Sequence, residues 1–427
     1  MGLWYNRRTP TLGASAVPDF FPFAGIRYDD RGGSADLTAR AAPPYDVIDE
    51  AHRSLLEATD PENAVRLILP RDGEIEGDRY ARAAADYANW CGRGVLVPDT
   101  EPRFYGYRMD FTDEHGRPRH TTGVLGALAL PEAGEGGVLP HERTLPKAKS
   151  DRLSLLRATR LNLDPIWCLS LTVGLTAAID TSVALSSCTG EDGTTHSLFA
   201  IDDPATQQAI RDCVAANPLV LADGHHRFET ALAYRDERRR SGAADPGAEA
   251  IMALVVELAD DQLNIEPIHR LVHLPASGGL RDLLAESFTV TAAGPNTADG
   301  VAALEQLMQA NGGMGLVDAQ GLAVLVADPD VASRALAAEA APVAGTDAAL
   351  FEAVALPLLA GASIEYRHDA AGGAALVGSG GADAALLLRP VSVADTRAAA
   401  MAGARMPQKT TFFAPQPRTG MVFRSLD

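Results

Sequence analysis

The chain has 427 residues, of which 46% are hydrophobic and 22% are charged, and its net charge is −19. This length exceeds what one compact core usually holds, so two domains are expected. A surface this acidic repels nucleic-acid phosphates and anionic membranes, so nucleic acid and membranes are excluded as expected partners. No apolar segment follows the twin arginines near the start, and the four cysteines show no CxxC spacing, so the cytoplasm is the expected location.

In chain order, residues 1–20 are predicted to be a flexible tail, and residues 21–275 are predicted to form the main domain. The domain opens with a strand at "FPFAGIRYDD", and Asp49 is placed to cap a helix from Glu50 to Ala58. "YARAAADYANWCG" has helical spacing, and "RFYGYRMDF" and "TTGVLGALAL" predict a β-hairpin around a polar turn.

Further along, the pattern predicts a strand that feeds a helix. "SDRLSLLRATRLNL" predicts a helix with Ser150 as its cap, "NPLVLAD" a buried strand, and "HRFETALAYRDERRR" the helix after it. "IMALVVELAD" and "LNIEPIHRLVHL" predict another hairpin around "DDQ". Over residues 276–427 alanine and glycine rise while helical stretches alternate with strands, which predicts a smaller C-terminal α/β subdomain whose end returns to the site. The expected fold class is α/β, in the sense of mixed α+β.

Five adjacent residues, Asp223, Gly224, His225, His226 and Arg227, stand where the predicted strand gives way to the helix. Gly224 permits a sharp turn and close approach of a ligand. The start of a helix favours phosphate, and Arg227 adds a guanidinium fork for phosphate oxygens. Asp223 is a candidate ligand for Mg²⁺ or a partner for His225, and both histidines can donate hydrogen bonds. The structural alternative is that Asp223 caps the helix and the histidines are surface residues.

The chain has only three lysines, Lys147, Lys149 and Lys409. We expect Lys147, Lys149 or Arg152 to bring positive charge to the phosphates of a ligand, and Lys409 to close over the site. Chance clustering of three residues is the alternative for the lysines.

Four more residues are candidates for binding the substrate. Tyr45 and Asp46 lie in "PPYDV", a proline-stiffened loop that shapes a pocket or is simply a turn. His269 and Arg270 are expected to line the same cleft, with surface positions on a hairpin as the alternative.

Several segments together resemble the domain-of-unknown-function 1015 family of bacteria and archaea. They are "AAPPYDVI", "NAVRLILP", "LPHERTLPKAKSDR", "ADGHHRFETAL", "IHRLV" and "MPQKTTFFAPQPRTG". The Asp-Gly-His-His-Arg box also resembles a box of the ParB/sulfiredoxin-like fold and is most similar to that of the free-serine kinases. This resemblance implies a ParB/sulfiredoxin-like element within a larger mixed-sheet domain. Sulfiredoxins carry a reactive cysteine where this chain has His225, so sulfinic-acid reduction is not implied.

The same resemblance implies a nucleotide-dependent kinase that phosphorylates the hydroxyl of a small molecule such as free serine or a related amino acid. Its expected cofactors are ATP or ADP and Mg²⁺. Glu142 is the predicted general base, by analogy with an upstream glutamate of the serine kinases. Two alternatives stay open: a ParB-like nucleotide-binding switch, and a metal-dependent phosphoesterase using Asp223, His225 and Glu142. A homodimer is among the expected assemblies.

Overall fold

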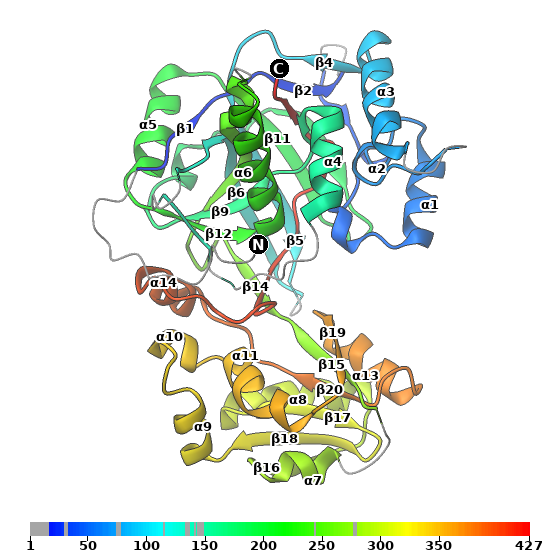
Figure 1. The fold of residues 1–427 in the computed structure, drawn as a ribbon, viewed down its shortest axis with the longest axis vertical. Helices are drawn as coiled ribbons and strands as arrows, with labels where there is room; N and C mark the ends of the chain where they lie inside the picture. The colour runs from blue at the N-terminus through cyan, green and yellow to red at the C-terminus, as the bar shows by residue number, and fades with distance from the viewer. Residues whose placement is uncertain are drawn as a thin grey trace. The chain divides into compact units, whose positions relative to one another are not determined.

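The computed structural model describes residues 17–29, 33–73, 78–113, 116–132, 137–140, 142, 149–242, 245–275 and 280–427. The chain divides into two compact units (Figure 1). Unit 1 comprises residues 1–140, 144–264 and 415–427, and unit 2 comprises residues 141–143 and 265–414. Both units combine helices with mixed or antiparallel sheets, so the α/β class predicted from the sequence is confirmed.

A large mixed sheet forms the centre of unit 1, in the order β3-β10-β11-β5-β6-β13-β9-β12-β7 with β1 beside β6. Its strands are β1 Phe20–Phe21, β3 Ala35–Asp36, β5 Phe104–Thr112, β6 Pro118–Ala129, β7 Val138–Pro140, β9 Ile166–Ser170, β10 Ala184–Thr189, β11 Thr195–Ile201, β12 Leu219–Asp223 and β13 Ala250–Glu257. The predicted hairpin is confirmed, because β5 and β6 pair antiparallel.

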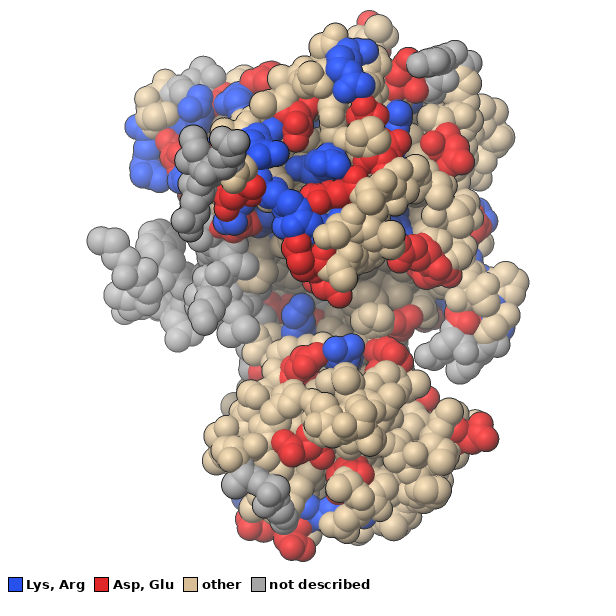
Figure 2. All heavy atoms as spheres, turned by 90° about the vertical axis from the view of Figure 1, so that its right-hand side faces the viewer, with Lys and Arg blue, Asp and Glu red and all other residues tan. Residues whose placement is uncertain are grey.

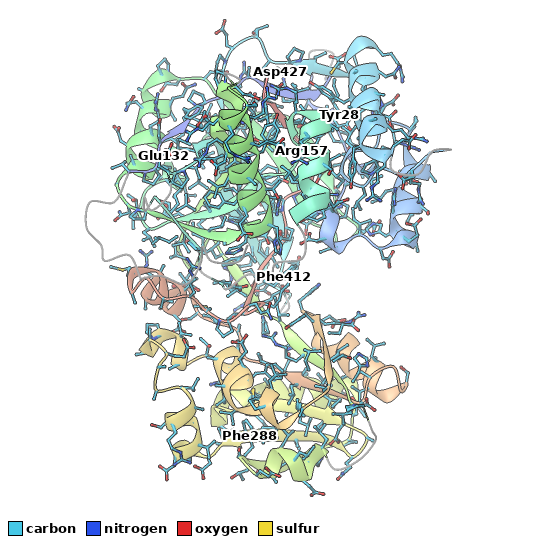
Figure 3. All side chains as sticks on the ribbon, viewed as in Figure 1. Tyr28, Glu132, Arg157, Phe288, Phe412 and Asp427 are labelled. Carbon is cyan, nitrogen blue, oxygen red and sulfur yellow. The ribbon has the colours of Figure 1, made fainter. Side chains whose placement is uncertain are left out.

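The helices of unit 1 pack on this sheet and on one another. They are α1 Glu50–Thr59, α2 Val65–Ile68, α3 Arg79–Gly92, α4 Lys149–Thr159, α5 Pro204–Ala215 and α6 His225–Arg240. Phe228 and Ala231, three residues apart on α6, enter the same apolar core as the strands. Arg157 lies between α4 and α6 (Figure 3) and pairs with Glu237 of α6.

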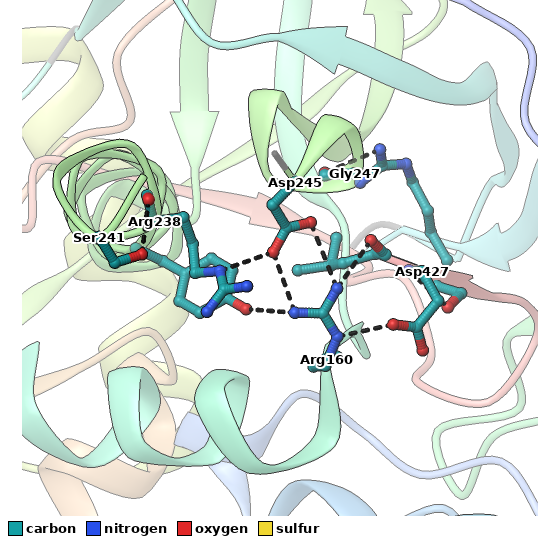
Figure 4. Close-up of polar contacts among 10 residues, drawn as sticks. Arg160, Arg238, Ser241, Asp245, Gly247 and Asp427 are labelled. Carbon is teal, nitrogen blue, oxygen red and sulfur yellow. Dashed lines mark hydrogen bonds and ion pairs between the residues drawn. The ribbon is translucent and has the colours of Figure 1, made fainter. Parts of the chain in front are cut away.

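A second, smaller sheet of unit 1 brings the C-terminus back to the N-terminal part of the chain. Its order is β4-β2-β22-β8, with β4 Leu96–Pro98, β2 Gly25–Tyr28, β22 Phe423–Ser425 and β8 Leu161–Asn162. Arg160 has a φ of +52°. Its guanidinium donates hydrogen bonds to the carboxylates of Asp245 and Asp427 and to the carbonyl oxygen of Leu426 (Figure 4). The end of the chain is therefore part of the unit 1 fold.

Unit 2 is a sheet covered by helices on both faces, in the order β16-β18-β17-β20-β15-β19. Its strands are β15 His269–His273, β16 Phe288–Gly294, β17 Met314–Asp318, β18 Gly321–Ala327, β19 Ser363–Arg367 and β20 Ala384–Leu387, with β14 Asn264–Pro267 and β21 Thr411–Ala414 forming a separate pair. Its helices are α7 Leu280–Ala285, α8 Ala298–Asn311, α9 Pro329–Ala335, α10 Ala341–Ala344, α11 Asp347–Leu350, α12 Leu356–Leu358, α13 Ala370–Gly378 and α14 Val393–Met401. On the face in Figure 2 most of unit 2 is uncharged, whereas unit 1 shows charges of both signs interspersed.

Three predictions of local structure were wrong. Helix α4 begins at Lys149, so Ser150 lies inside it rather than capping it, and Leu161 and Asn162 form strand β8. The segment "FPFAGIRYDD" holds the end of one strand and a second strand rather than a single strand. β13 pairs with β6 and β9, whereas β15 pairs with β19 and β20, so the hairpin predicted around "DDQ" does not form.

Candidate functional site

The Asp-Gly-His-His-Arg box lies at the strand-to-helix junction predicted for it. Asp223 ends β12, whose register against β9 shifts between Leu221 and Asp223, and α6 begins at His225. Gly224 is the N-cap residue in the left-handed conformation, with a φ of +84°. A Cβ at this position would lie 3.0 Å from Cγ2 and 3.1 Å from Cα of Ile166, so the turn requires glycine for both conformation and space.

Arg227 is held rigidly in the first turn of α6. Its guanidinium donates hydrogen bonds to the Asp223 carboxylate and to the carbonyl oxygen of Pro165. The side chain is 12% exposed. Burial lowers the pKa of Arg227, but the charges of Asp223, Asp164 and Tyr45 outweigh it and raise the pKa above its ordinary value, so the guanidinium stays charged.

A cavity of about 60 Å³ lies beside Arg227 and involves three of the residues predicted for the site. Tyr45, Arg152 and Arg227 line it, and the guanidinium carbon of Arg152 lies 4.4 Å from the centre of the Tyr45 ring. Asp46, next to Tyr45 in a single 3₁₀ turn, is exposed and contributes negative charge near Arg227. The structure therefore brings together Tyr45, Arg152 and the Asp-Gly-His-His-Arg turn within unit 1.

Two side-chain atoms near this turn are buried without a hydrogen-bond partner in the described part of the chain. They are Nδ1 of His226 and Oγ1 of Thr230. Thr230 is 4% exposed and lines the cavity. Native proteins bury very few unpaired hydroxyls, so these atoms are available to a polar ligand.

Glu142 and Lys409 belong to unit 2 and contact each other there. The Glu142 carboxylate accepts hydrogen bonds from the amides of Lys409, Thr410 and Thr411 and from the Thr411 hydroxyl, at 2.9 to 3.1 Å. These four donors hold the Glu142 carboxylate in place within unit 2. Lys409 is exposed and has a φ of +55°.

His269 and Arg270 begin strand β15 of unit 2, and both are only 2% exposed. The His269 ring accepts a hydrogen bond from the amide of Leu388, and burial lowers its pKa to about 4. Arg270 lies over the rings of Phe351 and Tyr366, and burial lowers its pKa to about 10. Both are interior residues rather than surface residues of a hairpin.

Two more predicted site residues are lysines near the start of α4. Lys147 lies outside the described residues, and Lys149 is described only as the first residue of α4.

Sequence reasoning missed Asp164, Thr230 and Thr419, which surround the cavity or contact its lining. Asp164 precedes a proline in "NLDPIW", and Thr419 stands in the quoted C-terminal segment, but no local pattern joins them.

Comparison with known families assigns this architecture. The family model described as "Protein of unknown function (DUF1015)" matches residues 20–348. The chain belongs to this family. No curated protein matches this chain.

Solved structures share 11 to 12% identity with this DUF1015 chain. A free serine kinase variant in complex with AMP aligns over 65% of this chain and 84% of its own, with a TM-score of 0.35. A conserved hypothetical protein from Pyrococcus furiosus aligns over 68% and 92%, and C-terminally truncated SbnI from Staphylococcus aureus over 69% and 85%, both with TM-scores of 0.35. Values this low do not establish a common fold, so the function is inferred from this chain's own residues.

In the described ranges, no group of three or more His, Cys, Asp or Glu side chains is arranged to hold a metal ion. None of the helices in those ranges is long and apolar enough to cross a bilayer.

Proposed function

We propose that this chain is a kinase that transfers a phosphoryl group from ATP or ADP to the hydroxyl of a small molecule such as free serine or a related amino acid. The observation that carries the proposal is the position of Arg227. Its guanidinium is fixed by Asp223 and Pro165 at the start of a 16-residue helix whose N-cap is a glycine without a side-chain cap.

This arrangement suits a phosphate group for two physical reasons. The amides of the first helical turn have no acceptor within the helix, and the helix dipole places partial positive charge at the same end. Gly224 leaves the backbone open to close approach, while Arg227 supplies a full charge. Phosphoryl transfer depends mainly on positioning and on stabilising the charge that develops on phosphate oxygens, which these groups provide.

Mg²⁺ fits this site only as an ion shared with the nucleotide. Magnesium in proteins commonly has one or two carboxylate ligands, with phosphate oxygens and water completing its shell. Asp223 is the carboxylate next to the turn, and Arg227 engages its Oδ2. Asp223 would hold the ion, which would neutralise charge on the phosphates.

The other residues predicted for the site stay predictions with stated roles. Arg152, Lys147 and Lys149 are proposed to add positive charge, and Glu142 is the predicted base. Tyr45 and Asp46 are proposed to shape the acceptor pocket. For His269, Arg270 and Lys409, which lie in unit 2, contact with the substrate stays a prediction from the sequence.

Phosphorus NMR tests the proposal. Wild-type chain is mixed with ATP or ADP, Mg²⁺ and a pool of L-serine, L-threonine and L-homoserine, beside Arg227→Ala and Glu142→Gln. The proposal predicts a new phosphomonoester signal that Arg227→Ala abolishes. Nucleotide binding without any product would favour the switch instead, and absence of both binding and product would contradict the proposal.

A further inference from the structure

The cavity beside Arg227 has both polar and apolar lining residues, all within unit 1. Besides Arg152 and Arg227, its polar lining consists of Asp164, Asn162, Thr230 and Tyr45. The other lining residues are aliphatic: Leu155, Leu156, Leu161, Leu163, Ala231 and Ile251. A volume of about 60 Å³ holds only a few water molecules. This space is too small for a nucleotide, because ligand pockets of that kind span roughly 300–1,000 Å³.

Positive charge in the cavity is already neutralised by protein carboxylates. Arg227 pairs with Asp223, and Arg152 pairs with Asp151 at 2.6 Å. Arg152 also donates to the carbonyl oxygen of Ile68. The interior of the cavity therefore suits an uncharged polar group on a short aliphatic chain, with the phosphate of the proposed function beside it, at the amides of the first turn of α6 and the outer side of Arg227.

Asp164 is the carboxylate among the described residues that line the cavity. It directly precedes Pro165, whose carbonyl oxygen accepts a hydrogen bond from Arg227, and both Asp164 and Arg227 line the cavity. The Thr419 hydroxyl donates to its Oδ1, and no donor from the described residues reaches Oδ2. Burial raises the pKa of Asp164 above its ordinary 3.8, against the opposing effects of Arg227 and Thr419.

Thr230 supplies a second, independent sign that a ligand belongs here. Its hydroxyl is buried on α6, lines the cavity and has no partner in the described part of the chain. Leaving a buried hydroxyl unpaired costs about 1–3 kcal/mol, and a ligand hydroxyl would remove that cost.

We propose that this cavity binds the hydroxyl end of the phosphoryl acceptor, and that Asp164, rather than the Glu142 predicted from the sequence, takes the hydroxyl proton. The inference rests on the proposed kinase function and assigns its acceptor class: a small compound with a hydroxyl on a short aliphatic chain. The acceptor oxygen forms a bond to the terminal phosphorus of the nucleotide as the bond from that phosphorus to the bridging oxygen breaks. The bridging oxygen keeps the electron pair, and the proton passes to Oδ2 of Asp164.

The test compares Asp164→Asn with Asp212→Asn, which changes an exposed aspartate on α5. We expect Asp164→Asn to lower turnover by about 10²-fold or more, the usual contribution of a positioned base, with nucleotide affinity within about twofold of wild type. Asp212→Asn is expected to match wild type. Turnover by Asp164→Asn within about threefold of wild type would overturn the assignment while leaving the kinase intact.

A pH profile separates a proton acceptor from a merely structural carboxylate. Thr419→Val removes the hydrogen bond that lowers the pKa of Asp164, so the acidic limb of the kcat profile should move to higher pH. An unmoved limb would contradict the role of Asp164.

Thr230→Val tests the acceptor contact, with Thr159→Val as a matched control because Thr159 is a buried threonine bonded within α4. KM for the acceptor should rise about tenfold in Thr230→Val and stay unchanged in Thr159→Val. Equal KM in both variants would overturn the acceptor assignment. If the wild type shows no turnover with any nucleotide and acceptor, the proposed kinase function is wrong. That result differs from turnover that persists in Asp164→Asn, which contradicts only the role of Asp164.

Discussion

At the scale of single residues, the site combines a guanidinium whose charge is paired with a carboxylate and a buried carboxyl that has one hydrogen-bond donor. Arg227 is buried but has Asp223 and a carbonyl as partners, so its burial is compensated. Asp164 has one donor, Thr419, and burial raises its pKa. A carboxyl kept in such surroundings destabilises the folded state when charged, which is common where function rather than stability selects a residue.

Asp164→Asn should therefore stabilise the protein at neutral pH. The pKa of Asp164 is raised in the folded state, so the protonated carboxyl favours folding. This contribution to stability is fully present below pH 3.8 and is lost as the pH rises through the pKa of the folded state. Thermal unfolding is measured from pH 4 to pH 8. Asp164→Asn should have a higher Tm than wild type at pH 7, and the difference in Tm between the two proteins should shrink toward pH 4. A variant that melts below wild type at pH 7 would contradict this reading of the carboxyl.

At the scale of elements, the β12–turn–α6 junction positions the site. The shifted register at the end of β12 and the left-handed Gly224 aim α6 so that Phe228 and Ala231 enter the core. With those two residues buried, Arg227 has no freedom to leave the cavity edge. The rigidity of the junction is thus a consequence of packing further along the helix.

Gly224→Ala should disrupt this junction more than Gly242→Ala disrupts the far end of α6. Both glycines have positive φ, +84° and +71°, so both variants incur about 1–2 kcal/mol for the left-handed conformation. A new Cβ meets Ile166 only at position 224, whereas nothing lies within 4 Å at position 242. Chemical denaturation should show a larger loss of unfolding free energy for Gly224→Ala, together with weaker nucleotide binding. Equal losses would mean that the close approach to Ile166 is unimportant.

Elements with strong local signals were predictable from the sequence, and their long-range pairings were not. Asp49 caps α1 as predicted, accepting a hydrogen bond from the amide of His52, because an N-cap is set by neighbouring residues. The mistaken "DDQ" hairpin failed because the neighbours of β13 come from residues 118–129 and 166–170. The cavity could not be predicted from the sequence for the same reason. Tyr45, Asp164, Thr230 and Thr419 are far apart in the chain and come together only in the folded unit.

At the scale of the whole molecule, the chain leaves unit 1 and returns to it for its last residues. Strand β22 pairs with β2 and β8, and Phe423 is completely buried. Arg424 donates to Asn162 Oδ1 and to the carbonyl oxygens of Ala250 and Gly247, each at 3.0 Å. The segment also delivers Thr419 to Asp164, so completion of the unit 1 fold and of the proposed acceptor site depend on the same residues.

A chain ending at Ala414 should destabilise unit 1 and spare unit 2. The truncation exposes the edges of β2 and β8 and removes the three hydrogen bonds of Arg424. Hydrogen exchange should show faster exchange in peptides from β2 and β8, with unchanged protection in β17, β18 and β20. Equal loss of protection in both units would show that they do not unfold as separate cooperative blocks.

The central claim, that the Arg227 turn binds nucleotide phosphates, is tested most directly by titration calorimetry. ATP and ADP are titrated with Mg²⁺ into wild type, Arg227→Ala and Arg240→Ala, the last removing an arginine about 20 Å away at the other end of the same helix. We predict that wild type and Arg240→Ala bind with the same Kd, and that Arg227→Ala binds at least tenfold more weakly, a loss of about 1.4 kcal/mol or more. Equal binding by all three chains, or no binding by wild type, would contradict the claim.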